Sequence, residues 1–106
     1  MTEGILIFCT CENQEEARRI ARDVVENRLA ACANIITSVQ SIYRWQGEIT
    51  EAEEVQLLIK TTQNRYPDVQ KRITELHSYD TPEIFAVPLM AVSDKYLAWL
   101  RAQSNE

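Results

Sequence analysis

The residues best suited to chemistry are the single histidine of the chain and the first of its three cysteines. His77 is followed by Ser78, Tyr79 and Asp80, so hydroxyls and a carboxylate surround it in the sequence, and Cys9 ends a short apolar segment near the N-terminus. A thiolate and an imidazole are ligands that copper and zinc accept. Because the chain has no C-x-x-C motif and no pair of histidines, these two residues form a metal site only if the fold brings them together.

The same residues also have structural and catalytic interpretations. Free cysteines such as Cys9 and Cys32 commonly fill protein cores as small apolar side chains, and a histidine at a helix C-terminus is favoured by the helix dipole. In a catalytic site, His77 would act as a base with Ser78 or Cys9 as the nucleophile. Ser78 is adjacent to His77, which is a poor geometry for proton transfer, and the two glycines of the chain form no phosphate-binding loop. We therefore expect no enzymatic activity.

Two carboxylates follow the histidine where a helical pattern gives way to an apolar run. Asp80 and Glu83 lie on either side of Pro82. Either residue would orient His77 in a catalytic site, but aspartate commonly holds a turn by accepting hydrogen bonds from nearby backbone N–H groups. We predict that Asp80 and Glu83 act mainly in the structure of this turn.

Composition sets broad limits on the class of protein. The chain has 106 residues, with 45% hydrophobic and 25% charged residues, which indicates one folded domain over residues 1–106. A net charge of −5 without a basic cluster argues against a nucleic-acid partner. No apolar run is long enough for a signal-peptide core or a membrane span. Three cysteines make no disulfide framework, so we expect a cytoplasmic protein with reduced thiols.

The elements that must position the candidate residues follow from hydrophobic periodicity. Asn13 is a helix N-cap with Glu16 three residues later, and Gln46-Gly47 separates two long β-rich stretches. The pattern predicts strands at 4–10, 32–45, 48–61 and within 83–90, and helices at 14–27, 66–76 and after Ser93. Pro88 places the last strand at an edge or a bulge. The order β-α-β-β-α-β with a C-terminal helix is the ferredoxin-like, split-βαβ arrangement, an α+β fold.

The two central strands are unusually long for a domain of this size. A hairpin of this length extends beyond the core and exposes unpaired backbone groups, which favours pairing with another subunit. Tyr43 and Trp45 flank the turn, and Trp99 lies off the apolar stripe of the last helix. We expect Tyr43, Trp45 and Trp99 to lie at a subunit interface, because Tyr and Trp are enriched there. The nearby acidic run of Glu48, Glu51, Glu53 and Glu54 predicts a solvated strand face.

Motifs spread over nearly the whole chain resemble the CutA divalent-cation-tolerance family. They are Cys9-Thr10, Leu29-Ala30-Ala31-Cys32 with Asn34-Ile35, Tyr43-x-Trp45-x-Gly47-x-Ile49, Glu54, Ile59-Lys60-Thr61, the His77 segment and Tyr96-Leu97-x-Trp99. The resemblance implies a ferredoxin-like subunit in a homotrimer whose long hairpins pair between subunits. It also implies a role in tolerance of copper and other divalent metals, with copper binding and no established enzymatic activity. Cys9 and His77 match copper ligands described for the family, whereas Leu76 stands where that pattern has a second histidine.

The sequence therefore predicts a trimeric, non-enzymatic protein of the CutA type that binds copper through Cys9 and His77. The alternative is a PII-like regulatory module that binds a small molecule in clefts between subunits. A copper chaperone would carry paired thiols, and a PII-type sensor would carry a basic, glycine-bearing loop for phosphates. The chain shows neither feature cleanly, so the alternative stays open.

Overall fold

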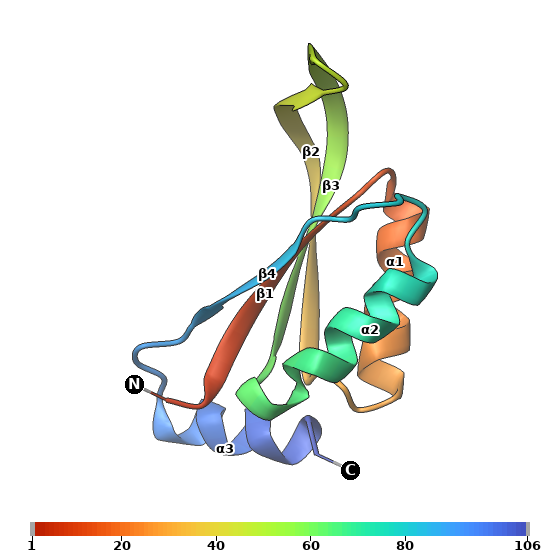
Figure 1. Cartoon of the computed structure of the whole chain (residues 1–106). Helices are drawn as coiled ribbons and strands as arrows, with labels where there is room; N and C mark the ends of the chain where they lie inside the picture. The colour runs from red at the N-terminus through yellow and green to blue at the C-terminus, as the bar shows by residue number, and fades with distance from the viewer. Residues whose placement is uncertain (1, 106) are drawn as a thin grey trace.

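The computed structural model describes residues 2–105 and places four strands and three α-helices along the chain (Figure 1). The elements follow the predicted order, and a short 3-10 helix joins the third strand to the second α-helix. They are β1 (Gly4–Cys11), α1 (Gln14–Glu26), β2 (Cys32–Trp45), β3 (Glu48–Thr62), η1 (Gln63–Arg65), α2 (Tyr66–Leu76), β4 (Ile84–Pro88) and α3 (Asp94–Gln103). The predicted boundaries agree with these to within a few residues.

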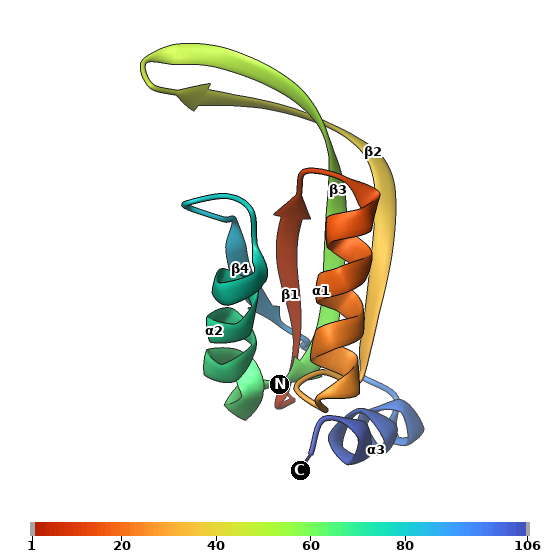
Figure 2. The same ribbon diagram turned by 90° about the vertical axis from the view of Figure 1, so that its right-hand side faces the viewer.

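The strands form one antiparallel sheet in the order β2-β3-β1-β4, which is the ferredoxin-like topology expected from the sequence. Helices α1 and α2 lie side by side on one face of the sheet (Figure 2). Helix α3 lies across the end of the sheet that is away from the hairpin turn (Figure 1). Strand β4 forms one edge and ends at Pro88, so this proline costs the sheet no central hydrogen bond.

The core fills the space between the sheet and the helices α1 and α2. Alternation along the strands turns one set of side chains toward the helices, and these side chains meet the apolar stripes of α1 and α2. Fully buried members are Ile7, Leu57 and Ile59 from the sheet and Ile20, Val24, Val69 and Ile73 from the helices. Each such side chain contributes about 1.5–3 kcal/mol through burial, so this layer supplies most of the hydrophobic stability.

Helix α1 begins where the sequence indicates, with a variation on the expected cap. The Asn13 side chain accepts a hydrogen bond from the Glu16 N–H at 2.8 Å. The Glu16 carboxylate accepts from the Glu12 N–H at 3.0 Å, one residue before the N-cap. The cap therefore fixes Glu16 with its carboxylate turned inward, where it reaches the candidate site described below.

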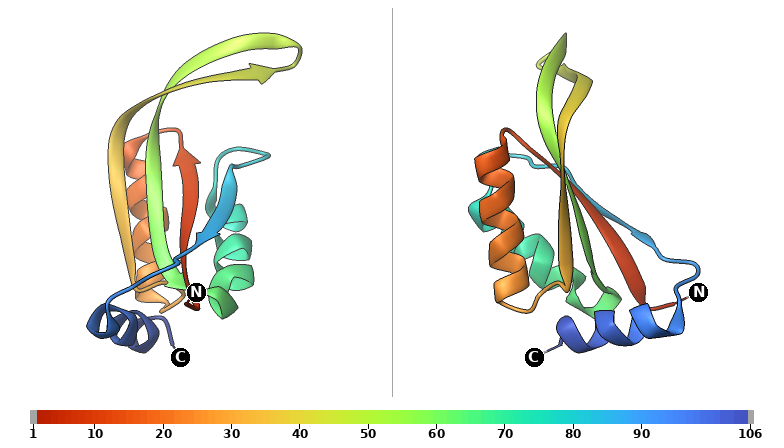
Figure 3. Two further views of the ribbon diagram at one scale, coloured as in Figure 1. Left: turned by 90° about the vertical axis from the view of Figure 1, so that its left-hand side faces the viewer. Right: turned by 180° about the vertical axis from the view of Figure 1, so that it is seen from behind.

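The β2–β3 hairpin extends far beyond the core and bends over at its end (Figure 3). Its turn residues Gln46 and Gly47 have φ values of 49° and 82°, the two positive angles that a type I′ turn requires. Nearer the core, the pairing register of β2 shifts between Ile36 and Val39, and Ser38 has a φ of 61°. This bulge increases the local twist and thereby redirects the rest of the hairpin.

Among the described residues, no layer of helices covers the face of the sheet opposite α1 and α2 (Figure 3). Phe8 and Phe85 stack across β1 and β4 with ring centroids 4.9 Å apart, and Phe85 remains 46% exposed. We call this side the open face. Strand alternation places on it Leu6, Phe8, Ile36, Leu58, Phe85 and Val87. A contiguous apolar face of this kind is typical of an interaction surface.

Candidate metal centre

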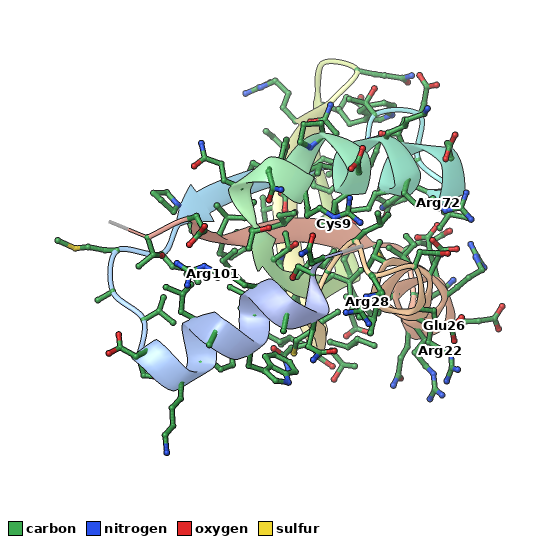
Figure 4. The ribbon with its side chains drawn as sticks, turned by 90° about the horizontal axis from the view of Figure 1, so that it is seen from below. Cys9, Arg22, Glu26, Arg28, Arg72 and Arg101 are labelled. Carbon is green, nitrogen blue, oxygen red and sulfur yellow. The ribbon has the colours of Figure 1, made fainter. Side chains whose placement is uncertain are left out.

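Three soft or borderline ligand side chains meet at the end of β1. The Sγ atoms of Cys9 and Cys11 and a ring nitrogen of His77 all lie within 4.8 Å of one another. We call these three residues the thiol–imidazole cluster. Figure 4 labels Cys9, whose side chain lies in the interior of the fold. The fold thus brings together the two residues that the sequence singled out, and adds a third.

Local structure explains why the three side chains converge. Cys9 and Cys11 are two residues apart on a strand, so both point toward the helices, and both are fully buried. His77 is the C-cap of α2, and its N–H bonds the Ile73 carbonyl at 2.8 Å. The imidazole itself is fully buried over the end of β1. Cys11 was not among the predicted site residues, although its i, i+2 spacing from Cys9 indicated a shared face of the strand.

Hydrogen bonds fix the protonation of the His77 ring. The Tyr79 backbone N–H donates to Nδ1 at 3.1 Å, so Nδ1 carries a lone pair. Nε2 lies 2.8 Å from the Thr10 carbonyl oxygen and therefore carries the proton that it donates. Both ring nitrogens are thus engaged by backbone groups. A metal ion that binds the ring must displace one of these two bonds.

Glu16 is the nearest charged group to the cluster. Its Oε2 lies 3.9 Å from His77 Nδ1 and accepts a hydrogen bond from the Ser78 N–H at 2.7 Å. Burial by itself raises the pKa of this carboxyl, but the hydrogen bonds from Ser78 and Glu12 outweigh burial and hold the pKa below its ordinary value. Glu16 therefore remains an anion beside the cluster and ties the start of α1 to the segment after α2.

The Cys9 thiol is strongly held in its protonated form. Its hydrogen bond with Cys11 and its burial raise the pKa far above the ordinary range of a thiol, and the negative charge of Glu16 adds to this shift. Metal binding must therefore release the thiol proton.

The geometry and donor types of the cluster fit a soft cation. Metal–sulfur bonds are about 2.3 Å long, so two donors on one ion are at most about 4.6 Å apart. The observed upper separation of 4.8 Å needs only small movements to reach this range. Thiolates and imidazole select Cu(I) and zinc over hard cations.

Tyr79 lies between the cluster and strand β3, with its ring centroid 4.8 Å from that of His77. Its hydroxyl donates to Glu54 Oε2 at 2.6 Å, and burial together with the Glu54 carboxylate raises the pKa of this phenol. Glu54 is only 7% exposed, so the prediction of a solvated face is wrong for this residue. The long-range contact with Tyr79 explains the difference. The other members of the acidic run, Glu48, Glu51 and Glu53, are exposed as expected.

The remaining predicted residues are not members of the cluster. Glu83 accepts a hydrogen bond from the Thr10 hydroxyl at 2.7 Å and so reaches across to β1, while Asp80 is exposed in the turn. Tyr43, Trp45 and Trp99 are 40%, 54% and 42% exposed. Trp99 lies on α3 against Tyr96, with ring centroids 5.5 Å apart.

Cys32 is partly exposed rather than buried as a core residue. Its Sγ lies 4.0 Å from Asn34 Oδ1 on the same strand. Cys32 faces the open side of the sheet because it pairs with Lys60, whereas Cys9 faces the helices. It therefore does not join the thiol–imidazole cluster.

The protein is a ferredoxin-like domain with an extended central hairpin and a buried thiol–imidazole cluster. Residues 5–103 match the family described as CutA1 divalent ion tolerance protein, and the chain belongs to this family. The resemblance seen in the sequence motifs is thereby confirmed.

Relatives and solved structures are similar over nearly the whole chain. The divalent-cation tolerance protein CutA of Thermus thermophilus is 48% identical over 99% of this chain and 100% of that protein. The crystal structure of CutA from Xylella fastidiosa has a TM-score of 0.96 and 38% identity, covering 98% of this chain and 100% of that one. Human Protein CutA is 43% identical over 89% of this chain, which spans only 52% of its length. Other relatives are named as chloroplastic or periplasmic.

Within residues 2–105, no helix is long and apolar enough to span a membrane.

Proposed function

We propose that this member of the divalent ion tolerance family is a trimeric, non-enzymatic protein that binds copper. The observation that carries the metal assignment is the thiol–imidazole cluster, with its ligand atoms within 4.8 Å of one another. Two sulfurs and one nitrogen are a soft donor set, which favours Cu(I) among the available ions.

The chain's own residues would prepare the site for the ion. Cys9 and Cys11 would release their thiol protons to hold the ion, and the charge of Cu(I) would offset one of the two thiolate charges. His77 supplies the third donor once it exchanges a backbone hydrogen bond for the ion. Leu76, which stands where the family pattern has a second histidine, packs against the core instead. Cys11 provides the donor that Leu76 lacks.

Copper titration of variants tests this assignment. Cys9→Ser, Cys11→Ser and His77→Ala should each weaken Cu(I) binding about tenfold or more, because a site with so few ligands cannot lose one without effect. Competition with a chromophoric Cu(I) chelator under anaerobic, reducing conditions measures the affinity. Cys32→Ser is the matched control, since its thiol lies outside the cluster, and it should bind like the parent protein. Equal affinity in all four variants would remove the cluster from the function.

The open face and the hairpin support the trimer. Both edges of the sheet and the apolar open face require cover that the described residues do not provide, and closed three-fold symmetry would cover them and end assembly at three subunits. Tyr43 and Trp45 on the hairpin and Trp99 on α3 are the aromatic contacts we assign to this interface. Their partial exposure in the single chain supports this role.

Two further parts of the proposal are that the protein is not an enzyme and that it is cytoplasmic. The bonding of His77 supports the first, and the reduced cysteines support the second. A general base needs an available lone pair, whereas both His77 nitrogens are bonded to backbone groups. The three cysteines are free, which fits the reducing cytoplasm.

A second candidate function is the PII-like one, in which the protein binds a small molecule in a cleft. The observation that favours it is a cavity of about 580 Å³ between the outer part of the hairpin and the segment after α2, lined by Tyr43, Trp45, Glu54, Tyr79, Asp80 and Glu83 among others. A cavity of this size is within the range of small-molecule sites. Its lining decides which ligands it accepts.

A further inference from the structure

The cavity between the outer part of the hairpin and the segment after α2 is lined by both acidic and aromatic side chains. Glu54, Asp80 and Glu83 contribute three carboxylates, and no lysine or arginine lines the cavity. Within the part of the chain that the structure describes, none of these carboxylates forms an ion pair. The hydroxyls of Tyr79 and Thr10 bond Glu54 and Glu83, but they are neutral. The cavity therefore attracts cations and repels phosphates and other anions.

Glu54 is the most buried of the three carboxylates that line the cavity. Its side chain is more than nine-tenths buried, at 7% exposure, yet its only hydrogen-bond partner among the described residues is the Tyr79 hydroxyl. A buried charge without an opposite charge is costly, and a cation from outside would reduce that cost. The raised pKa of Tyr79 keeps its hydroxyl protonated, so Tyr79 holds the carboxylate in place without adding charge.

The aromatic residues distinguish between kinds of cation. Tyr43 and Trp45 line the cavity, and Tyr79 contributes a third ring. Aromatic faces attract weakly hydrated organic cations, with Trp the strongest. Hard metal ions instead require a nearly complete shell of oxygen ligands and give up water reluctantly. The lining thus favours an organic cation over Mg²⁺ or Ca²⁺.

We infer that this cavity binds a small organic cation, an ammonium or guanidinium group attached to an apolar body. The charged group lies toward Glu54, and the apolar body lies against Tyr43 and Trp45. The inference gives the second candidate function its ligand class and rests on that candidate, whereas it does not depend on copper binding at the thiol–imidazole cluster.

Calorimetric titration at pH 7 with benzylammonium tests the inference, because benzyl alcohol is a neutral molecule of nearly the same shape. We expect saturable binding of one benzylammonium per chain, and affinity for benzyl alcohol at least about tenfold weaker. Inorganic phosphate and MgCl₂ are titrated in parallel. The molecular mass is measured on the same sample, so that the cavity is tested in the assembly that exists in solution.

A pair of neighbouring variants locates the site. Glu54→Gln removes the charge and keeps an oxygen that can accept from Tyr79, so it should weaken benzylammonium binding about tenfold or more. Glu53→Gln makes the same change one residue away, on the opposite and exposed side of β3, and should bind like the parent. Unchanged melting temperatures show that both variants fold.

Three results would overturn the inference. Equal binding of benzylammonium to the parent and to Glu54→Gln would move the cation to another site. Binding of phosphate or Mg²⁺ in place of benzylammonium would show that the cavity takes another ligand class, and the ligand-cleft candidate would survive. No binding of any of the four probes would overturn the inference and remove the ligand-cleft candidate as well.

Discussion

The two halves of strand β3 differ sharply in what covers them. In the second half, Leu57 and Ile59 are fully buried between the sheet and the helices. In the first half, Ile49 is 63% exposed. Ile42, on the segment of β2 that pairs with this half, is 67% exposed. One strand thus runs from a complete core into a segment that has no core of its own. Backbone pairing extends over both halves, so hydrogen bonds alone do not account for the stability of the hairpin.

The comparison shows which half depends on other chains. An isolated two-stranded hairpin is marginally stable in water, because it buries too little apolar surface to offset its ordering entropy. The exposed isoleucines on a long edge would also promote aggregation, which the exposed Glu51 and Glu53 oppose only in part. The core half is stabilised within the chain, whereas the hairpin half is the part that we propose a partner subunit covers.

Truncation of one isoleucine or leucine in each half should produce the largest contrast. Leu57→Ala removes a fully buried side chain and should lower the free energy of unfolding by about 2–5 kcal/mol. Ile42→Ala removes an exposed side chain and should act on assembly instead. Thermal melts at a series of protein concentrations separate the two effects.

For Leu57→Ala we expect a lower melting temperature at every concentration. For Ile42→Ala the loss should shrink as concentration rises, because mass action restores the assembly. A Leu57→Ala loss that disappears at high concentration, or an Ile42→Ala loss that does not change with concentration, would break the distinction between the two halves.

Acidification should affect the core half through Glu16. The pKa of this carboxyl is lower in the folded protein than in the unfolded chain, so ionised Glu16 contributes stability above its unfolded pKa. That stability is lost as the pH falls from the ordinary glutamate range through the folded pKa. We expect Glu16→Gln to cost about 1–3 kcal/mol at pH 7 and to flatten the acid side of the stability profile. Urea unfolding between neutral and acidic pH measures both, and a parallel profile for the variant would contradict this role.

The smallest effects should come from the turn after α2. Glu83→Ala removes the acceptor of the Thr10 hydroxyl bond and, because Glu83 is exposed, should cost no more than about 1 kcal/mol. Asp80 is exposed, so Asp80→Ala should lower the melting temperature only slightly. Cu(I) affinity should stay unchanged in Asp80→Ala. A stable Asp80→Ala variant that no longer binds copper would assign Asp80 to the metal site instead of the turn.

Much of the fold was accessible from local sequence. The turn at Gln46-Gly47 and the cap at Asn13 each carry a local signal, and the structure confirms both. The strand order followed from the sequence of elements because few topologies accommodate it. The bulge at Ser38 had no such signal, since serine rarely adopts a positive φ.

The site was less accessible because it depends on long-range contacts. Cys9 and His77 are far apart in sequence, and only the packing of α2 on β1 brings them together. Cys11 required the further knowledge that the strand continues past Thr10 with the same face inward. The burial of Glu54 depends on Tyr79, 25 residues later in the chain, so an acidic run alone predicted a solvated face.

The molecular mass in solution tests the central claim most directly. If the hairpin and the open face are covered by other copies of the chain, light scattering coupled to chromatography at micromolar concentration should give about three times the 12.2 kDa chain mass. The melting temperature should then rise with protein concentration. A monomer of about 12.2 kDa, with a melting temperature independent of concentration, would show that the hairpin half is stable alone and would contradict the account.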